Sequence, residues 1–296
     1  MAYWETAHSL EGPAMSTASA VTVSPLALER LAALKSALAN MGNVAVAYSG
    51  GVDSTFLLAV AHHVLGDQVL AVTSAGRAAP ARDIQRTRAF CRERGIKQVV
   101  IDYDELAIPE FANNPKDRCY HCKKALFTQM SQAAAAQGIT RLVDGSNKDD
   151  EGDYRPGMKA LVELGVSSPL REAGLTKAQI RELSRDMGLP TWDMPSAACL
   201  ASRFVYGEHI TAEKLKRVEL AEDFLHDLGL AQVRVRVHGE TGDLARIEVE
   251  EQDIARLAQQ DLRHKLVDHL RALGFTYVSL DLLGFRSGAM NESIGR

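Results

Sequence analysis

The 296-residue chain is long enough for two domains and carries a net charge of −4. Hydrophobic residues make up 46% of it and charged residues 24%, which is the balance of a globular protein that buries a sizeable core. This mildly acidic charge argues against broad electrostatic binding of nucleic acid or of an anionic membrane, so we expect neither as a partner.

Strands and helices alternate in the first half of the chain. Residues 1–25 are rich in Ala, Ser and Thr without periodicity, which predicts a flexible N-terminal tail, and a helix is predicted at 26–41. The strands that follow are predicted at 44–49, 69–74, 98–103 and 141–145, and the helices between them at 55–65, 81–94 and 120–137. Short apolar strands without alternation are typical of strands buried on both faces. This α/β pattern predicts a Rossmann-like parallel sheet with flanking helices over residues 26–194.

The pattern changes after Asp193. A helix is predicted at 212–228, with Thr211 as its N-cap residue. Strands are then predicted at 232–238, 244–249 and 277–282, with helical stretches at 253–259 and 262–273. This order indicates a smaller α+β domain over residues 195–296.

The motif SGGVDS (residues 49–54) lies between the first predicted strand and the next helix. Gly50 and Gly51 allow the backbone to approach a phosphate closely, and the N-terminus of the helix favours an anion there. Ser49 and Ser54 add hydroxyl donors. Asp53 fits beside a phosphate if Mg2+ lies between them, or if its side chain holds the shape of the loop. The alternative is an ordinary tight turn, which needs one glycine.

SGGVDS resembles the signature of the PP-loop ATP pyrophosphatases, which bind ATP, adenylate a substrate and release pyrophosphate. The segment AVTSAG (residues 71–76) is similar to the segment whose backbone reads adenine in that class. The resemblance implies ATP and Mg2+ as cofactors, with Asp53 and Asp150 as magnesium ligands. The implied ATP-binding residues are Ser49, Gly50, Gly51, Asp53, Ser54, Thr73 and Gly145.

Five further motifs resemble one family of this class, the LarE sulfur transferases of nickel-pincer cofactor synthesis. They are RCYHCKKAL (118–126), DGSNKDDEGDYRPGMKAL (144–161), SPLREAGLTKAQIR (168–181), PSAACLASRF (195–204) and LDLLGFRSGAMNE (280–292). In that family the substrate is pyridinium-3,5-biscarboxylic acid mononucleotide. ATP adenylates a carboxylate of this substrate, and a sulfur nucleophile then displaces AMP to give a thiocarboxylate. The resemblance covers residues 26–292.

No stretch reaches the roughly 18 apolar residues of a membrane span, and the N-terminus lacks the pattern of a secretory signal. We therefore expect a cytoplasmic protein with reduced thiols, and we expect Cys91 in the core. Members of the LarE family differ in their sulfur source. Cys119, Cys122 and Cys199 suit a [4Fe-4S] cluster with one open iron, which is the favoured hypothesis. Two alternatives stay open: a structural zinc site on Cys119 and Cys122 with Cys199 or His121, and Cys199 as a sacrificial sulfur donor.

Basic residues are expected to hold the anionic groups of the substrate. Arg234 and Arg236 alternate on one predicted strand and so share a face, which suits oxyanion binding. The resemblance adds Ser202 and Arg203 to the substrate site. Glu222 in the second domain is a further candidate, with a position on a surface face as the alternative. Lys123, next to the C-x-x-C pair, is predicted to orient or protonate the reacting groups.

Other readings of the same motifs stay open. A tRNA thiolase, a zinc-dependent queuosine-type enzyme and a non-enzymatic sensor of adenine nucleotides could each contain a PP-loop. The mild acidity disfavours the first, because a tRNA thiolase needs a basic surface. The family resemblance also implies a homo-oligomer, a sulfide source and a downstream nickel-insertion enzyme as partners.

Overall fold

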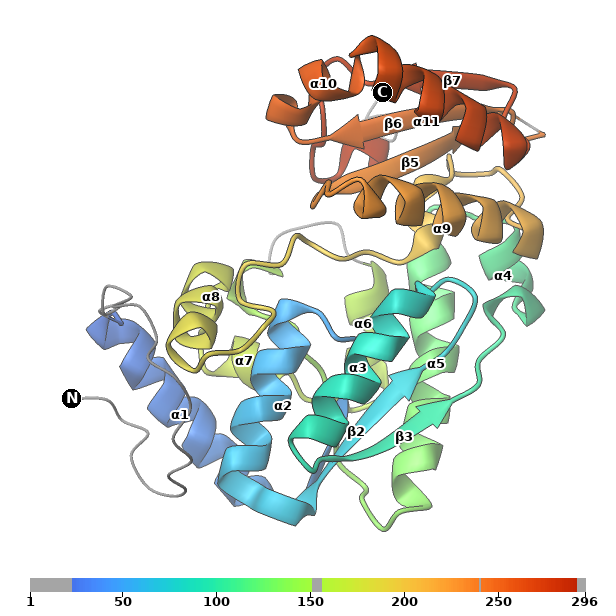
Figure 1. Cartoon of the computed structure of the whole chain (residues 1–296). Coiled ribbons are helices and arrows are strands. Elements are labelled where there is room, and N and C mark those ends of the chain that lie inside the picture. The colour runs from blue at the N-terminus through green and yellow to red at the C-terminus, as the bar shows by residue number, and fades with distance from the viewer. Residues whose placement is uncertain (1–22, 151–155, 240, 292–296) are drawn as a thin grey trace.

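Four short apolar strands form the first sheet. A computed structural model describes residues 23–150, 156–239 and 241–291 (Figure 1). The strands are β1 (Val44–Ala47), β2 (Val69–Ser74), β3 (Lys97–Ile101) and β4 (Leu142–Val143). They are parallel and lie in the order β3-β2-β1-β4, which confirms the predicted parallel sheet.

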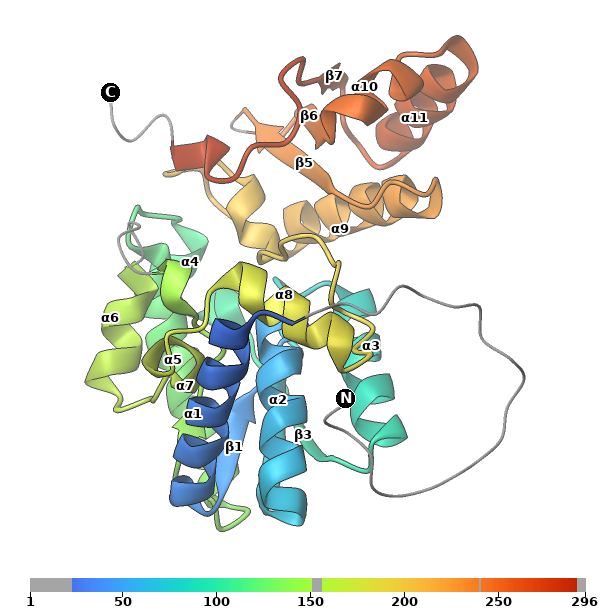
Figure 2. The same cartoon turned by 90° about the vertical axis from the view of Figure 1, so that its left-hand side faces the viewer.

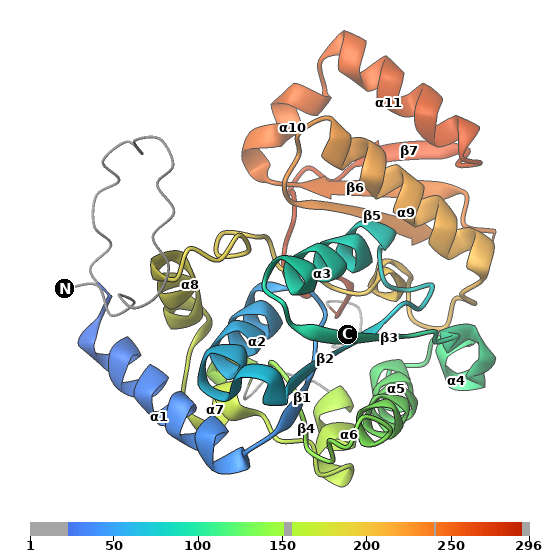
Figure 3. The same cartoon turned by 60° about the horizontal axis from the view of Figure 1, so that its bottom comes forward.

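Alternate residues of β1 enter two different cores, because successive side chains of a strand point to opposite faces. Val44 and Val46 pack with α1, α2, α3 and α8, whereas Ala45 packs with α5 and α6. Figure 3 shows α2 and α3 on one side of the strands and α5 and α6 on the other. These helices are α1 (Pro25–Met41), α2 (Val52–Leu65), α3 (Ala81–Glu93), α5 (Arg118–Ala135), α6 (Pro156–Glu163) and α8 (Lys177–Asp186).

The strand order changes direction at β1. β2 and β3 lie on one side of β1, and β4 lies on the other. In open parallel sheets, ligands bind at such a point, outside the carboxyl ends of the strands. The SGGVDS motif follows β1 and Gly145 follows β4, so the fold places both at this edge.

A second sheet contains three strands, in the order β5-β6-β7, and packs with three helices. β5 pairs with β6 in antiparallel fashion, and β6 pairs with β7 in parallel. Val233, Val235 and Val237 of β5 enter a core shared with all three helices, which leaves the intervening arginines on the opposite face. The elements are β5 (Val233–His238), β6 (Leu244–Val249), β7 (Tyr277–Leu280), α9 (Ala212–Asp227), α10 (Glu251–Leu257) and α11 (Gln260–Ala272).

The two sheet units contact each other through α9, which lies on the side of the second unit that faces the first (Figure 2). Ala78 and Phe111, which precede the predicted boundary, belong to the core of the second unit. Phe111 comes from the short helix α4 (Pro109–Ala112). Side chains that precede residue 195 thus complete the core of the second unit. The predicted domain boundary between residues 194 and 195 stays a prediction.

The predicted strands and helices occur with ends that differ by a few residues. Thr211 caps α9 as predicted, because its hydroxyl accepts the N–H of Lys214 at 3.2 Å. The tail predicted for residues 1–25 lies mostly outside the described residues, and Pro25 is already helical. The helices α4, α6, α7 (Pro169–Glu172) and α8 were not predicted. No helix within the described ranges is long and apolar enough to cross a membrane.

Candidate active site

The SGGVDS loop turns sharply between β1 and α2. Gly50 has a φ of 78°, which favours glycine, and a Cβ atom there would lie 2.9 Å from Cγ2 of Thr87. Gly51 is the N-cap of α2, so the free N–H groups of the first helical turn lie at the loop. The hydroxyls of Ser49 and Ser54 lie 3.1 Å apart. This is the local geometry of an anion site at a helix N-terminus, and binding of ATP there stays a prediction.

The other two predicted ATP-binding residues lie beside this loop. A Cβ atom on Gly145 would lie 3.0 Å from the backbone nitrogen of Ser54, so a side chain there would crowd the first turn of α2. Thr73 is buried, and its hydroxyl donates to the carbonyl of Tyr48 at 2.9 Å. The Thr73 side chain therefore fixes the start of the loop, and its predicted role in binding ATP stays a prediction.

Glu105 holds the segment that follows β2, a role that the sequence did not indicate. Its carboxylate accepts the N–H groups of Arg77 at 2.9 Å and Ala78 at 3.4 Å, and a side chain at Gly76 would collide with it. Burial raises the pKa of Glu105, and the backbone donors oppose the rise. The carbonyl of Ala78 in turn accepts the N–H of Leu200 at 2.8 Å, which joins this segment to the residues around Cys199.

Asp53 is paired with Lys177, the first residue of α8. The Lys177 amine lies 2.5 Å from Oδ2 of Asp53, while Oδ1 of Asp53 is buried without a hydrogen-bond partner among the described residues. A carboxylate oxygen of this kind fits Mg2+, which prefers oxygen ligands. Lys177 was missed by the sequence interpretation, because it lies 124 residues from Asp53 and no local pattern links them.

Asp150, the other predicted magnesium ligand, lies on a neighbouring turn. Its Oδ2 accepts the N–H of Asn147 at 2.9 Å. On the same turn, Asp149 accepts the backbone N–H of Lys177 at 2.8 Å. Lys177 thus connects this turn to Asp53, and the role of Asp150 as a magnesium ligand stays a prediction.

The fold brings the three predicted cysteines together. Cys119 and Cys122 lie in the first two turns of α5, and Cys199 directly precedes the 3₁₀ turn Leu200–Arg203. Burial raises the pKa of the Cys122 thiol to about 12, and the nearby Cys199 and Cys119 thiols add to this rise. Cys91 lies in the core of the first sheet, as predicted.

These thiols do not form a ready metal site. Across the residues that the structure describes, no three His, Cys, Asp or Glu side chains are arranged to hold a metal ion. Cys122 also packs against the apolar core of the second unit, and the hydroxyl of Tyr103 donates to its carbonyl at 3.0 Å. This arrangement does not fit a bound cluster or zinc ion. The [4Fe-4S] cluster therefore stays a prediction without support from the geometry.

Arg118 lies among the cysteines and was not singled out in the sequence. It is 3% exposed, it donates to the carbonyl of Ala201 at 2.9 Å, and its Nη2 lies 3.9 Å from Sγ of Cys119. Its sequence position, beside the C-x-x-C pair on a helix, looks like that of a surface residue. The structure instead places a buried positive charge next to the thiols.

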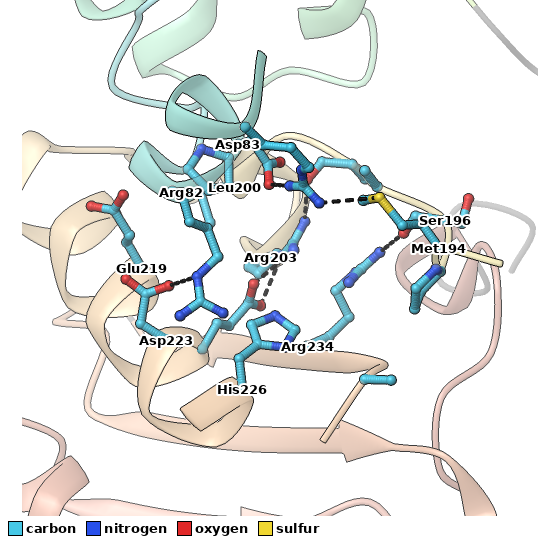
Figure 4. Close-up of a pocket in the computed structure, with 17 residues that line it drawn as sticks. Arg82, Asp83, Met194, Ser196, Leu200, Arg203, Glu219, Asp223, His226 and Arg234 are labelled. Atoms are coloured by element: carbon cyan, nitrogen blue, oxygen red, sulfur yellow. Dashed lines mark hydrogen bonds and ion pairs between the residues drawn. The ribbon is translucent and has the colours of Figure 1, made fainter. Parts of the chain in front are cut away.

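A cavity of about 230 Å³ lies between α3, α9 and the segment before Cys199 (Figure 4). Most of the charged side chains that line it are neutralised in pairs, so they offer little net charge to a ligand. The pairs are Arg203–Glu222, Arg86–Asp83 and Arg82–Asp223. Arg203 and Glu222, which were both predicted to bind substrate, therefore form an ion pair with each other in the wall of the cavity.

Arg234 differs from the other arginines of this cavity. Its guanidinium donates to the carbonyls of Val233 and Ser196 and lies 5.2 Å from the centre of the Phe285 ring, and it forms no ion pair within the described ranges. Burial lowers the pKa of Arg234 to about 10, and the nearby Arg203 adds to the decrease. An anion bound here would stabilise this charge, so the cavity fits a phosphate or a carboxylate.

Arg236 shares a strand face with Arg234, as predicted, but its charge is balanced within the fold. It donates to Oε2 of Glu248 through two hydrogen bonds of 3.0 and 2.8 Å. A third bond, of 3.0 Å, joins it to the carbonyl of Ser202. Arg236 and Ser202 are not among the residues that line the cavity.

Lys123 lies on α5, and its side chain contacts α6. A Cβ atom on Gly157 of α6 would lie 2.6 Å from its Cδ, and its amine is 6.0 Å from the centre of the Phe127 ring. The same glycine lies close to the carbonyl of Cys119. Lys123 is thus near Cys119 and apart from the cavity, and its predicted catalytic role is a proposal.

Comparison with known proteins agrees with this architecture. Residues 29–151 match the NAD synthase family. The chain is 38% identical over 265 residues to the pyridinium-3,5-bisthiocarboxylic acid mononucleotide synthase of Lactiplantibacillus plantarum, which covers 89% of this chain and 94% of that protein. It is 40% identical over 263 residues to an uncharacterised protein of Synechocystis sp., covering 89% and 97%. A glutamine-hydrolysing GMP synthase of Aeropyrum pernix is 26% identical over 200 residues, covering 61% of this chain and 38% of that protein.

The parallel sheet, the SGGVDS loop and the NAD synthase match define a PP-loop enzyme that uses ATP. The similarity to the L. plantarum synthase extends over both sheet units and not over the loop alone. The chain belongs to the LarE family, and it is an ATP-dependent sulfurtransferase of cofactor biosynthesis.

Proposed function

We propose that the chain converts pyridinium-3,5-biscarboxylic acid mononucleotide into a thiocarboxylate, with ATP as the activating reagent. The L. plantarum relative is named as the synthase of a pyridinium bisthiocarboxylic acid mononucleotide. The observation that carries the proposal is the cavity around Arg234. Its buried guanidinium without an ion-pair partner among the described residues suits the phosphate of a mononucleotide.

The first step takes place between the loop and the cavity. A carboxylate oxygen of the substrate attacks the α-phosphorus of ATP, pyrophosphate leaves, and an acyl adenylate forms. The N–H groups at the start of α2 would hold the phosphates, and Asp53 would hold Mg2+. When bound, Mg2+ supplies positive charge that stabilises the leaving pyrophosphate.

The second step needs a sulfur nucleophile near the cavity, and we assign this role to Cys199. Cys199 is exposed and follows residues 195–198, which line the cavity, whereas Cys122 is only partly exposed and packs against the apolar core of the second unit. Its sulfur attacks the acyl carbon, and AMP leaves. Loss of the Cα proton of Cys199 and cleavage of its Cβ–S bond then release the thiocarboxylate and leave dehydroalanine. In the [4Fe-4S] alternative Cys119, Cys122 and Cys199 would be ligands and not sulfur donors, and the arrangement of these thiols does not support it.

Incubation of the protein with ATP, Mg2+ and the pyridinium mononucleotide under exclusion of air tests this function. We expect pyrophosphate and AMP in equal amounts and a product in which sulfur replaces one oxygen, detected by mass spectrometry. Release of pyrophosphate that does not depend on the mononucleotide would contradict the proposed substrate. Formation of acyl adenylate without any sulfur-containing product would contradict the sulfur-transfer step.

A further inference from the structure

The last turn of α9 brings a histidine, His226, to the cavity that Arg234 lines. Its side chain is half-buried, and its ring points into the cavity (Figure 4). Histidine changes its charge between about pH 5 and 8, whereas arginine stays charged throughout that range. A histidine at this position can therefore change the net charge of the cavity near neutral pH.

One nitrogen of the His226 ring is held by the backbone. Nδ1 lies 2.8 Å from the carbonyl oxygen of Leu230, which can only accept a hydrogen bond, so Nδ1 carries a proton. In the neutral ring Nε2 is then an acceptor, and in the protonated ring it is a second donor. No hydrogen bond joins Nε2 to another of the described residues, so this nitrogen is available to a ligand.

The charges around the ring cancel one another. In the described part of the chain, four arginines and four carboxylates line the cavity, so their formal charges sum to zero. Arg234 forms no ion pair there, and the remaining carboxylate, Glu219, accepts from the amine of Lys216 at 2.9 Å. The other lining charges form the pairs Arg203–Glu222, Arg86–Asp83 and Arg82–Asp223, and Arg82 also reaches Asp227.

A phosphate in this cavity needs more positive charge than the lining arginines supply. Its two negative charges meet a wall that is neutral overall, and Arg234 is the arginine that is not already paired. Burial raises the pKa of Asp83 and of Asp223, and a protonated His226 opposes this rise together with their arginine partners. The ring thus lies within electrostatic reach of two carboxylates, which favour its protonated form.

We propose that His226 in its protonated form binds the phosphate of the mononucleotide together with Arg234, and that the protein takes up a proton from solvent as the mononucleotide binds. Nε2 donates to a phosphate oxygen, while the carbonyl of Leu230 keeps the ring oriented. The alternative is that His226 only satisfies a carbonyl at the end of α9. This proposal rests on the proposed function, because it concerns the binding of the same substrate.

Calorimetric titration with pyridinium-3,5-biscarboxylic acid mononucleotide and with its nucleoside, which lacks the phosphate, tests the proposal. At pH 7.5 an ordinary histidine is mostly neutral and a phosphate monoester is mostly dianionic, so proton uptake reports on the protein. We expect proton uptake with the mononucleotide and none with the nucleoside, measured from the heats in two buffers of different ionisation enthalpy. His226→Asn should abolish this uptake and weaken mononucleotide binding by about 10-fold, and it should leave nucleoside binding unchanged.

Asparagine is chosen because its amide nitrogen lies near the former Nδ1. It can still donate to the carbonyl of Leu230, whereas the second ring nitrogen and its charge are lost. His62→Asn is the matched control, because Nδ1 of His62 lies 3.1 Å from the carbonyl of Gly66, with the same spacing of four residues at the end of α2. It should change neither the affinity nor the proton uptake.

Three results would overturn the proposal and leave His226 as a structural residue of α9. They are absence of proton uptake by the unchanged protein, retained uptake in His226→Asn, and equal weakening of mononucleotide and nucleoside binding by that variant. Failure of the proposed sulfur transfer would show as absence of the thiocarboxylate, and it would not alter this comparison of the two ligands.

Discussion

Arg203 and Glu222 face each other through two hydrogen bonds of 2.8 Å, with side chains that are 3% and 7% exposed. Oε1 of Glu222 also accepts the N–H of Val235 at 2.9 Å. One carboxylate therefore connects the 3₁₀ turn after Cys199, helix α9 and strand β5. Loss of this carboxylate charge would leave a buried guanidinium without a partner, which is far more costly than loss of a surface pair.

We expect Glu222→Gln to lower the free energy of unfolding by about 3–5 kcal/mol. The measurement is urea denaturation followed by circular dichroism. Asp227→Asn is the control, because Asp227 pairs with Arg82 at 3.1 Å while 75% exposed, and its loss should cost no more than about 1 kcal/mol. Similar losses in the two variants would mean that the Arg203–Glu222 pair adds nothing beyond a surface ion pair.

Arg234→Gln should raise the KM for the mononucleotide by about 10- to 100-fold and leave the KM for ATP nearly unchanged. The physical reason is the loss of a charge-assisted contact with the substrate phosphate, which costs about 1.5–3 kcal/mol. Steady-state release of pyrophosphate, with each substrate varied in turn, provides both constants. Arg236→Gln serves as the comparison, since Glu248 already neutralises Arg236. A larger effect on the mononucleotide from Arg236→Gln, in a protein that stays folded, would reverse the assignment.

Asp53→Asn should greatly reduce pyrophosphate release, and it should shift half-maximal activity to higher Mg2+ concentration. An amide cannot supply the negative charge that attracts the ion, although it has nearly the same shape. A Mg2+ titration at saturating ATP measures the shift, and circular dichroism checks the fold. Asp67→Asn, at an exposed position beyond α2, is the control. Unchanged turnover and Mg2+ dependence in Asp53→Asn would exclude Asp53 from the nucleotide site.

The source of the sulfur can be read from the number of turnovers. If Cys199 donates its own sulfur, activity should stop after one sulfur per chain, and mass spectrometry should find dehydroalanine at position 199. Cys119→Ala and Cys122→Ala should then retain this single turnover. Repeated turnover with added sulfide after reconstitution with iron, lost in each of the three single variants and kept in Cys91→Ala, would instead establish the cluster.

The alternation of strands and helices could be predicted because it depends on local periodicity. Val233, Val235 and Val237 repeat at the spacing of a strand, and this repeat also placed Arg234 and Arg236 on one face. The partners of these arginines could not be predicted. They depend on the register of β5 and β6, in which Arg236 lies opposite Arg246 although its charge is neutralised by Glu248.

The candidate site shows the same limit. The role of the loop glycines could be predicted from the sequence, because a sharp turn or a close approach of the backbone requires glycine at that position. The roles of Lys177 and Arg118 could not be predicted, because their neighbours in space come from distant segments, and a basic residue on a helix is most often exposed. Glu105 was missed for a related reason, since burial of an acid depends on backbone donors that no side-chain pattern records.

The hydrogen bond from the N–H of Leu200 to the carbonyl of Ala78 has a consequence for the order of events. Ala78 belongs to the segment after β2, and Leu200 is the neighbour of Cys199. A second bond, of 2.7 Å, runs from the N–H of Ala81 to Glu219 of α9. These two bonds connect the segment after β2 both to the 3₁₀ turn after Cys199 and to helix α9. The segment proposed to lie beside ATP and the cysteine proposed to donate sulfur are therefore held at a fixed separation by the fold itself, so a substitution that breaks either bond would alter the spacing of the two half-reactions.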